Sequence, residues 1–260
     1  MSACRTGLSV AAMTLAAGLA MGADPGIGDD VLYQVSTINV LLDGGYDGML
    51  SFGDLKKYGD AGIGTFDRVD GEAVILGGVA YQAMADGRVR TVPDAMTTPF
   101  ACVTFFKADK TLELKAVPTL DALKAALDAK LESKGVFYAV RIDGAFASVK
   151  YRSVPKQAKP YPKLAEVTKN QPVFERSDIK GSLIGFWCPD LARAFNVPGW
   201  HLHFLSDDRQ SGGHLLECNL TEGRAQMDLT SEFFVKLPLE GVDAAAAAAD
   251  RSAELKAVEQ

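Results

Sequence analysis

Residues 64–92 read GTFDRVDGEAVILGGVAYQAMADGRVRTV, and this stretch decides the fold class. Runs of β-branched and apolar residues alternate in it with the dipeptides Asp70-Gly71 and Asp86-Gly87. An Asp-Gly pair between apolar runs is a strong short-range signal for a β-hairpin, because glycine accepts the positive φ that tight hairpin turns require. The stretch therefore predicts three β segments, 64–69, 73–84 and 88–92, connected by turns.

The same pattern continues on both sides of this stretch. Further β segments are predicted at 31–42, 100–106, 136–142, 145–151 and 181–235, with Asp143-Gly144 as a turn. Helices are few. Ser51 is a candidate N-cap for a short helix reaching about Tyr58, and Thr119 for a helix over 120–134 that ends at Gly135. Short strands with few helices favour an α+β fold over alternating βαβ units.

Hairpin-rich sequence lies on both sides of the predicted helix 120–134. This arrangement indicates two similar β-rich halves with mixed or antiparallel sheets in a single compact unit. The predicted halves are residues 24–118 and 119–243. Residues 244–260 then form a C-terminal tail that begins with a run of alanines.

The composition excludes several classes of protein. The chain has 260 residues, 48% hydrophobic and 23% charged, so it can bury a sizeable core and is neither a disordered protein nor a small disulfide scaffold. Its 27 basic and 33 acidic residues give a net charge of -6. Because Lys and Arg contacts to phosphate supply most of the affinity for nucleic acid, we expect no nucleic-acid partner.

The first 23 residues have the features of a secretory signal peptide. Arg5 precedes an uncharged stretch at 8–20, which is too short to span a bilayer, and small residues follow. Cleavage after Gly22 or Ala23 predicts an exported chain, periplasmic or secreted; the alternatives are a buried N-terminal helix and, if the signal is not used, a cytoplasmic chain. No later stretch is long and apolar enough to span a membrane, so no membrane partner is expected.

Three cysteines remain once Cys4 is removed with the signal: Cys102, Cys188 and Cys218. The number is odd and no pair has the C-x-x-C spacing, so buried free thiols are favoured. Export would permit a disulfide among them, and the pairing cannot be read from sequence.

The three histidines of the chain, His201, His203 and His214, lie within fourteen residues. In residues 199–205, GWHLHFL, strand alternation puts both histidines on one face and the apolar side chains on the other. The polar, glycine-containing loop 206–213 would turn the chain back and bring His214 beside His203. Three imidazoles without cysteine suit a divalent ion with open coordination positions, and zinc is the favoured ion. The alternative is three unrelated histidines on a polar face.

Two charged residues stand at the ends of apolar strand faces. Glu72 shares its face with Val74 and Leu76, and Arg141 shares its face with Phe137 and Ala139. A charge in such a place is costly to bury unless it is paired or functional. Either residue by itself is more often an edge residue in solvent, and the two gain interest only beside a metal.

At this point the sequence resembles the alpha-acetolactate decarboxylase family. The resemblance covers most of residues 30–235 and follows the family order. The matching stretches are Gly62-Ile-Gly-Thr-Phe66, Asp70-Gly-Glu72, Pro99-Phe-Ala101, Arg141-Ile-Asp-Gly-Ala-Phe146, Gly185-Phe-Trp187, Asn196-Val-Pro-Gly-Trp-His-Leu-His-Phe204 and Asp207-Asp-Arg-Gln-Ser-Gly-Gly-His214.

The resemblance implies an α+β fold, frequent homodimers and a zinc ion on His201, His203 and His214. It also implies catalytic groups at the positions that match Glu72 and Arg141, and a C-terminal glutamate that reaches back to the metal site. Glu259 is the favoured glutamate and Glu254 the other candidate, although the alanine run departs from the family pattern. Thr65 is a plausible hydroxyl on the substrate side.

The implied reaction converts acetolactate, 2-hydroxy-2-methyl-3-oxobutanoate, to acetoin and carbon dioxide. Zinc chelated by the ketone and hydroxyl oxygens would polarise the carbonyl and stabilise an enediolate. Arg141 would hold the carboxylate or the enediolate oxygens, and Glu72 with the C-terminal glutamate would transfer protons. Three alternatives stay open: a cupin-like metalloenzyme, a hydrase-type metalloenzyme and an exported zinc-binding protein.

Overall fold

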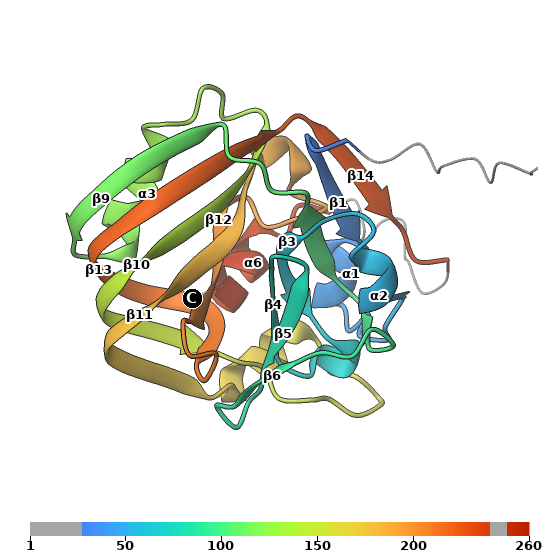
Figure 1. The fold of residues 1–260 in the computed structure, drawn as a ribbon. Coiled ribbons are helices and arrows are strands. Elements are labelled where there is room, and N and C mark those ends of the chain that lie inside the picture. Colours follow the sequence, from blue (N-terminus) through green and yellow to red (C-terminus); the bar gives the residue numbers. More distant parts are fainter. Residues whose placement is uncertain (1–27, 240–248, 260) are drawn as a thin grey trace, which may run out of the picture.

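The computed structural model describes residues 28–239 and 249–259. Two β-sheets lie side by side, with the C-terminal helix between them (Figure 1). The predicted α+β class and single compact unit are confirmed. The predicted signal peptide and most of the alanine run lie outside the described residues, and no described helix has the length and apolar character needed to cross a membrane.

The first sheet has seven strands in the order β14-β1-β8-β3-β4-β5-β6, and only the β1–β14 pair is parallel. Its strands are β1 (Val31–Val35), β3 (Ala61–Thr65), β4 (Glu72–Leu76), β5 (Val79–Ala83), β6 (Val89–Thr91), β8 (Ala101–Thr104) and β14 (Glu232–Lys236). A separate two-stranded pair is formed by β2 (Leu50–Ser51) and β7 (Thr97–Thr98).

The second sheet is antiparallel, with five strands in the order β10-β11-β12-β13-β9. Since β10 also pairs with β13, the strands β10 to β13 form a closed circuit of pairings. The strands are β9 (Lys110–Val117), β10 (Phe137–Arg152), β11 (Val173–Cys188), β12 (Gly199–Ser206) and β13 (Gly212–Thr230).

Short helices cover the sheets and connect them. The α-helices are α1 (Ile38–Leu42), α2 (Phe52–Leu55), α3 (Leu120–Asp128), α4 (Leu164–Val167) and α6 (Ser252–Glu259). Short 3-10 turns are formed by Asp67–Val69, Thr168–Asn170 and Asp190–Ala192. Ser51 and Thr119 cap α2 and α3 as predicted, because each side chain accepts a hydrogen bond from a backbone N–H of the first turn.

Three apolar clusters among the described residues hold the fold together. The largest lies between the two sheets and contains Leu32 and Val74 from the first sheet and Ile184 and Phe186 from the second. Another fills the closed second sheet beneath α3, and the last lies between the first sheet and α2. The two sheets therefore share one buried interface.

The strand pairing crosses the predicted boundary between the halves at 118/119. Strand β9, from the predicted N-terminal half, pairs in the second sheet, and β14, from the predicted C-terminal half, pairs with β1 in the first. The three cysteines Cys102, Cys188 and Cys218 are buried and free, as favoured by the sequence.

The prediction of a hairpin turn at Asp143-Gly144 was wrong. Strand β10 runs for 16 residues straight through this dipeptide. Gly144 lies opposite Gly181 on one side and Gly223 on the other, and a Cβ at Gly144 would come within 2.6 Å of the Glu222 carbonyl oxygen. This glycine is required for the close approach of neighbouring strands and not for a turn.

Other predicted elements also have different bounds in the structure. The segment 31–42 divides after β1, because Thr37 caps α1 by accepting a hydrogen bond from the Val40 N–H. The segment 64–69 ends at Thr65 in a 3-10 turn, and 73–84 divides at Gly77-Gly78, where both glycines have positive φ. Helix α3 ends at Asp128 rather than Lys134, because the backbone N–H groups of Glu132 and Ser133 donate to the Tyr138 hydroxyl instead of continuing the helix.

Asp228 on β13 binds the segment that connects β8 of the first sheet with β9 of the second. Its buried carboxyl leads to a prediction about how stability depends on pH. Its carboxylate accepts the Lys107 N–H at 3.0 Å, and burial raises its pKa to about 7, with nearby aspartates adding to the rise. The folded state therefore holds this proton from about pH 4 to 7 while the unfolded chain has lost it, so stability falls as pH rises through that window.

We expect Asp228→Asn to stabilise the chain more at pH 8 than at pH 5, because the amide can accept the same N–H without a buried charge. The raised pKa allows at most about 4 kcal/mol. The melting temperature of wild type and variant at the two pH values measures this. An equal difference at pH 5 and pH 8 would show that the Asp228 charge does not limit stability.

Candidate metal centre and active site

The three histidines converge on the buried interface between the two sheets. His201 and His203 lie on β12, and His214 lies on β13 directly opposite His203, as the sequence predicted. Trp200, Leu202 and Phe204 alternate with the histidines and pack into the second sheet's own core, as expected. Strand alternation thus directs the imidazoles toward the first sheet.

The nitrogen spacing fits a single metal ion. His201 Nε2 lies 3.0 Å from His214 Nδ1 and 3.3 Å from His203 Nε2, and the three ligand atoms lie within 4.8 Å of one another. Nitrogens bound to one tetrahedral zinc ion at the usual bond length would be about 3.3 Å apart. The donor set is therefore compact enough to bind a divalent ion without moving the backbone.

The outer nitrogen of two of the imidazoles bonds to a backbone carbonyl. His203 Nδ1 lies 2.9 Å from the Ala73 carbonyl oxygen, and His214 donates to the backbone carbonyl of Glu259. Because a carbonyl only accepts, each of these ring nitrogens carries the proton and the inner nitrogen keeps its lone pair. The bond that fixes the tautomer of His203 comes from β4, and the bond that fixes the tautomer of His214 comes from α6. Both elements therefore orient the metal ligands.

All three histidines are held neutral. Burial lowers the pKa of His201 to about 3 and lowers the pKa of His203 and His214 well below the usual value; the charge of Arg152 adds to the effect at each. Neutral imidazole is the form that binds metal, so at neutral pH protons compete little for this site.

Two predicted glutamates flank the histidines from different elements. Glu72 Oε2, at the start of β4, lies 3.7 Å from His203 Nε2, and Glu259 Oε2, at the end of α6, lies 3.6 Å from His214 Nε2. Burial raises the pKa of both carboxyls, that of Glu72 to about 7. Carboxyls with a raised pKa can hold or release a proton near neutral pH.

Thr65 lies beside Glu72 in the β3–β4 pairing. Its hydroxyl is buried and donates to the Gly71 carbonyl at 2.7 Å. It therefore stabilises the turn that leads into Glu72. Glu254, the other C-terminal candidate, is one and a half turns before Glu259 on α6, and its carboxylate pairs with Arg251 at 2.6 Å. Of the two glutamates, only Glu259 reaches the histidines.

Arg141 is not brought into this cluster. It lies in the same cross-strand row as His203 with Ile184 between them, its side chain is 37% exposed, and its guanidinium pairs with Asp143 at 2.8 Å. Its described ion pair is thus with a neighbour on its own strand.

Arg152 is the arginine that the sequence analysis missed. It ends β10 opposite His214, is 3% exposed, and donates to Gln171 at 2.8 Å. Its charge lowers the pKa of Glu72 and of Glu259, against the effect of burial. The predicted segment 145–151 ended one residue before it, whereas β10 continues through Arg152.

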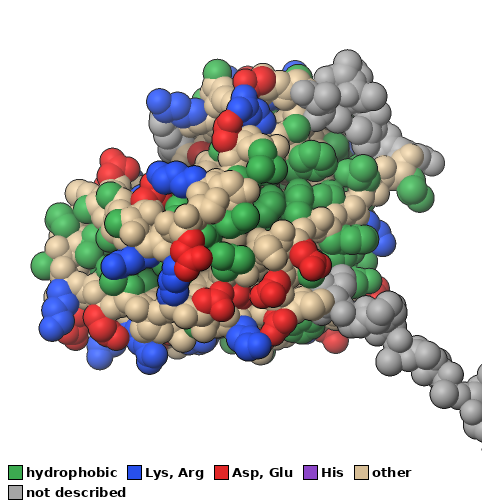
Figure 2. Space-filling model, turned by 90° about the horizontal axis from the view of Figure 1, so that it is seen from above, with side chains coloured by type: hydrophobic (Ala, Val, Ile, Leu, Met, Phe, Trp, Pro, Cys, Tyr) green, Lys and Arg blue, Asp and Glu red, His purple; other side chains and the backbone are tan. Residues whose placement is uncertain are grey.

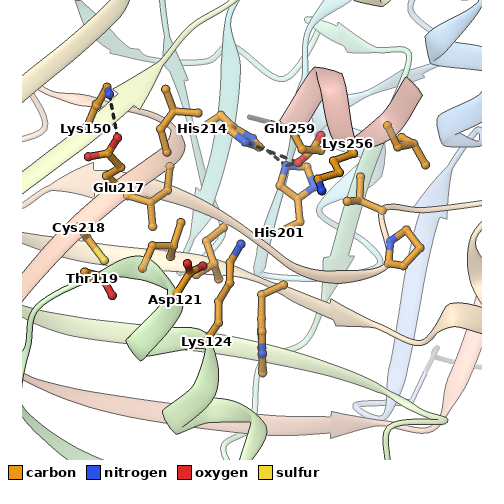
Figure 3. A pocket seen from close by; sticks show the side chains of 18 of the residues that line it. Thr119, Asp121, Lys124, Lys150, His201, His214, Glu217, Cys218, Lys256 and Glu259 are labelled. Atoms are coloured by element: carbon orange, nitrogen blue, oxygen red, sulfur yellow. Dashed lines mark hydrogen bonds and ion pairs between the residues drawn. The ribbon is translucent and has the colours of Figure 1, made fainter. Parts of the chain in front are cut away.

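A cavity of about 890 Å³ leads to the histidines from the side of α3 and α6. His201, His214 and Glu259 stand at its inner end, and the Lys124 side chain extends from α3 toward His201 (Figure 3). Lys150 is paired with Glu217 at 2.8 Å, while Lys256 extends near His201. The site is thus open to a small anionic molecule.

Comparison with known proteins identifies close relatives. The family model described as alpha-acetolactate decarboxylase matches residues 32–246. The alpha-acetolactate decarboxylase of Methanosarcina mazei is 49% identical over 212 residues, which are 82% of this chain and 74% of that protein. The alpha-acetolactate decarboxylase of Brevibacillus brevis is 44% identical over 80% of this chain and 73% of that protein. The crystal structure of the Bacillus subtilis strain 168 alpha-acetolactate decarboxylase superposes with a TM-score of 0.85 at 35% identity, covering 88% of this chain and 99% of that one.

The geometry predicts that the purified chain binds a divalent metal ion through its histidines. We expect His203→Ala to reduce the bound metal at least about tenfold, since it removes a ligand whose tautomer is set by Ala73. Metal content by elemental analysis measures this. Arg141→Gln is the matched control and should bind metal like wild type. Full metal content in the histidine variant would contradict the assignment.

Proposed function

Because the chain belongs to the alpha-acetolactate decarboxylase family, and is therefore a decarboxylating enzyme, we propose that it converts 2-acetolactate to acetoin and carbon dioxide with zinc on His201, His203 and His214. The observation that supports this most is the convergence of three neutral imidazoles, two buried carboxyls and a buried arginine, of which His201, His214 and Glu259 line one cavity.

The reaction requires a group that accepts the electron pair of the broken bond and a group that supplies a proton. The bond between the carboxylate carbon and C2 breaks, the electron pair moves through C2 to the ketone oxygen, and a proton added at C2 gives acetoin. When bound, zinc supplies a Lewis acid for the ketone oxygen. The protein itself must bind the carboxylate, orient it and deliver the proton.

We assign the cationic role to Arg152. A guanidinium binds a carboxylate through charge-assisted hydrogen bonds, and Arg152 is buried opposite His214 where these bonds are strong. Arg141, to which this role was first assigned, is partly exposed and paired with Asp143. Glu72 lies beside His203 and Glu259 beside His214, and both exchange protons with the substrate.

The alternatives from the sequence lose their support. The family match extends over residues 32–246, which include Glu72, Arg152 and all three histidines. A cupin-like enzyme, a hydrase-type enzyme or a zinc-binding protein would account for the three histidines. None of the three would require the buried Glu72 and Arg152.

The function is tested by acetoin formation from racemic acetolactate. We expect activity that is lost on chelation and restored by zinc. Arg152→Gln is expected to lower kcat by about 100-fold or more while metal content stays unchanged, since it removes a group that binds the reacting carboxylate. Arg141→Gln is the matched control, with kcat within about threefold of wild type.

Two results would contradict these assignments. A chain that holds zinc and makes no acetoin would overturn the proposed reaction and leave only the metal centre. A large loss of kcat in Arg141→Gln together with normal turnover in Arg152→Gln would return the cationic role to Arg141.

A homodimer is part of the proposal, and the edge of the first sheet is the surface we assign to it. Strand β14 ends the sheet order, and Phe234, Leu237 and Leu239, on or just after it, are at least half exposed. Figure 2, seen from above, shows hydrophobic side chains gathered on one part of the surface. An edge strand with exposed apolar residues is a template for pairing with another chain.

We expect Leu237→Glu to convert the dimer to a monomer, because a charge would be buried in the interface. Light scattering after size exclusion measures the mass. Leu191→Glu, at a residue that is 73% exposed elsewhere on the surface, is the matched control. A wild-type monomer, or equal dimers in both variants, would argue against this surface.

A further inference from the structure

We propose that Arg251 is a positioning residue: it anchors the start of α6 to α1 and thereby holds Glu259 beside the metal-binding histidines. The inference rests on the proposed role of Glu259 in proton transfer. It concerns a residue that lies two helical turns away from that carboxyl.

The anchor is a set of short polar contacts. Arg251 Nη1 lies 2.7 Å from Asp43 Oδ2 and donates to the Asn39 carbonyl at 3.2 Å, so it joins both the interior and the C-terminal end of α1. Its Nε and Nη2 donate to Glu254 at 2.8 and 2.6 Å. The Asn39 amide in turn donates to the Ala249 carbonyl at 3.1 Å. The Arg251 side chain is 11% exposed, so these bonds are largely shielded from water.

Helix α6 needs such contacts because it is short. It has eight residues, and an isolated helix of that length is marginal in water. Leu255 and Val258 are buried in the cluster between the sheets, together with Leu41 of α1 and Leu164 of α4. These apolar contacts hold one side of the helix, and Arg251 fixes the position of its first turn.

The end of α6 carries the site. Glu259 accepts from His214 through its backbone carbonyl, and its carboxylate lies 3.6 Å from His214 Nε2 and 3.9 Å from His201 Nε2. Figure 3 shows Glu259 directed at the histidines from this helix. A shift of the helix by about 1 Å would misplace the carboxyl, and misplacement on that scale can cost about 100-fold in rate.

No other charged contact of the described residues replaces the anchor. Lys163 lies 3.7 Å from Asp43, but it precedes α4 and cannot hold α6. Arg193 reaches Asp250 at 3.4 Å, but both side chains are more than 40% exposed, so this pair contributes little.

The first experiment compares Arg251→Gln in the wild-type and Glu259→Gln backgrounds. In the wild-type background we expect kcat to fall about tenfold to 100-fold with KM changed less than about threefold. In the Glu259→Gln background we expect a further change of less than about twofold, because the group that Arg251 positions is already absent. Arg251→Lys keeps the positive charge, so we expect its kcat to lie between those of Arg251→Gln and wild type.

The controls separate positioning from loss of folding. Arg88→Gln breaks an exposed ion pair with Asp86 and should leave kcat unchanged. If Arg251→Gln does not fold, Asp43→Asn removes the same ion pair from α1 and takes its place in the cycle. An equal loss of kcat in both backgrounds, or no loss in the wild-type background, overturns the proposal.

A second measurement does not depend on the reaction. Amide hydrogen exchange of residues 252–259 should be faster in Arg251→Gln, while exchange in β12 and β13 stays as in wild type. Unchanged exchange in 252–259 overturns the anchor. Faster exchange in a protein whose wild type makes no acetoin would keep the anchor and overturn the proposed function.

Discussion

The pairing of β12 with β13 is the constraint on which the site depends. It places His203 directly opposite His214, and alternation along β12 adds His201 on the same face. Gly185 on β11 lies against this strand, and a Cβ there would overlap the His201 carbonyl. The backbone beneath the histidines is therefore packed on both sides, which leaves little freedom in the spacing of the three nitrogens.

Burial is the second condition, and it favours the neutral form of all three imidazoles and both carboxyls. Placed between the two sheets, the imidazoles stay neutral, while the pKa values of Glu72 and Glu259 rise. Charges buried in this way are costly unless an opposite charge faces them. Arg152, itself 3% exposed, supplies that charge from the end of β10. A bound divalent cation would add to it at the same place.

The site also draws together parts of the chain that are far apart in sequence. Glu72 comes from the first sheet, the histidines and Arg152 from the second, and Glu259 from the C-terminal helix. Each outer contact, from Ala73 to His203 and from Glu259 to His214, crosses between these elements. The positions of the metal ligands and of the carboxyls consequently depend on the same packing between the two sheets.

The sequence by itself determined what depends on neighbouring residues. Strand alternation predicted the face of His201 and His203 in residues 199–205 and singled out Glu72 on its own strand, and the caps Ser51 and Thr119 predicted where α2 and α3 begin. Glu259 was selected through the family resemblance. Only the tertiary structure decided the arginine, the extent of β10 and the pairing of Glu254 with Arg251. The physical reason is that an Asp-Gly dipeptide serves equally as a turn or as a close strand contact. Which of the two occurs at Gly144 depends on Gly181 and Gly223, which pack against it from other strands.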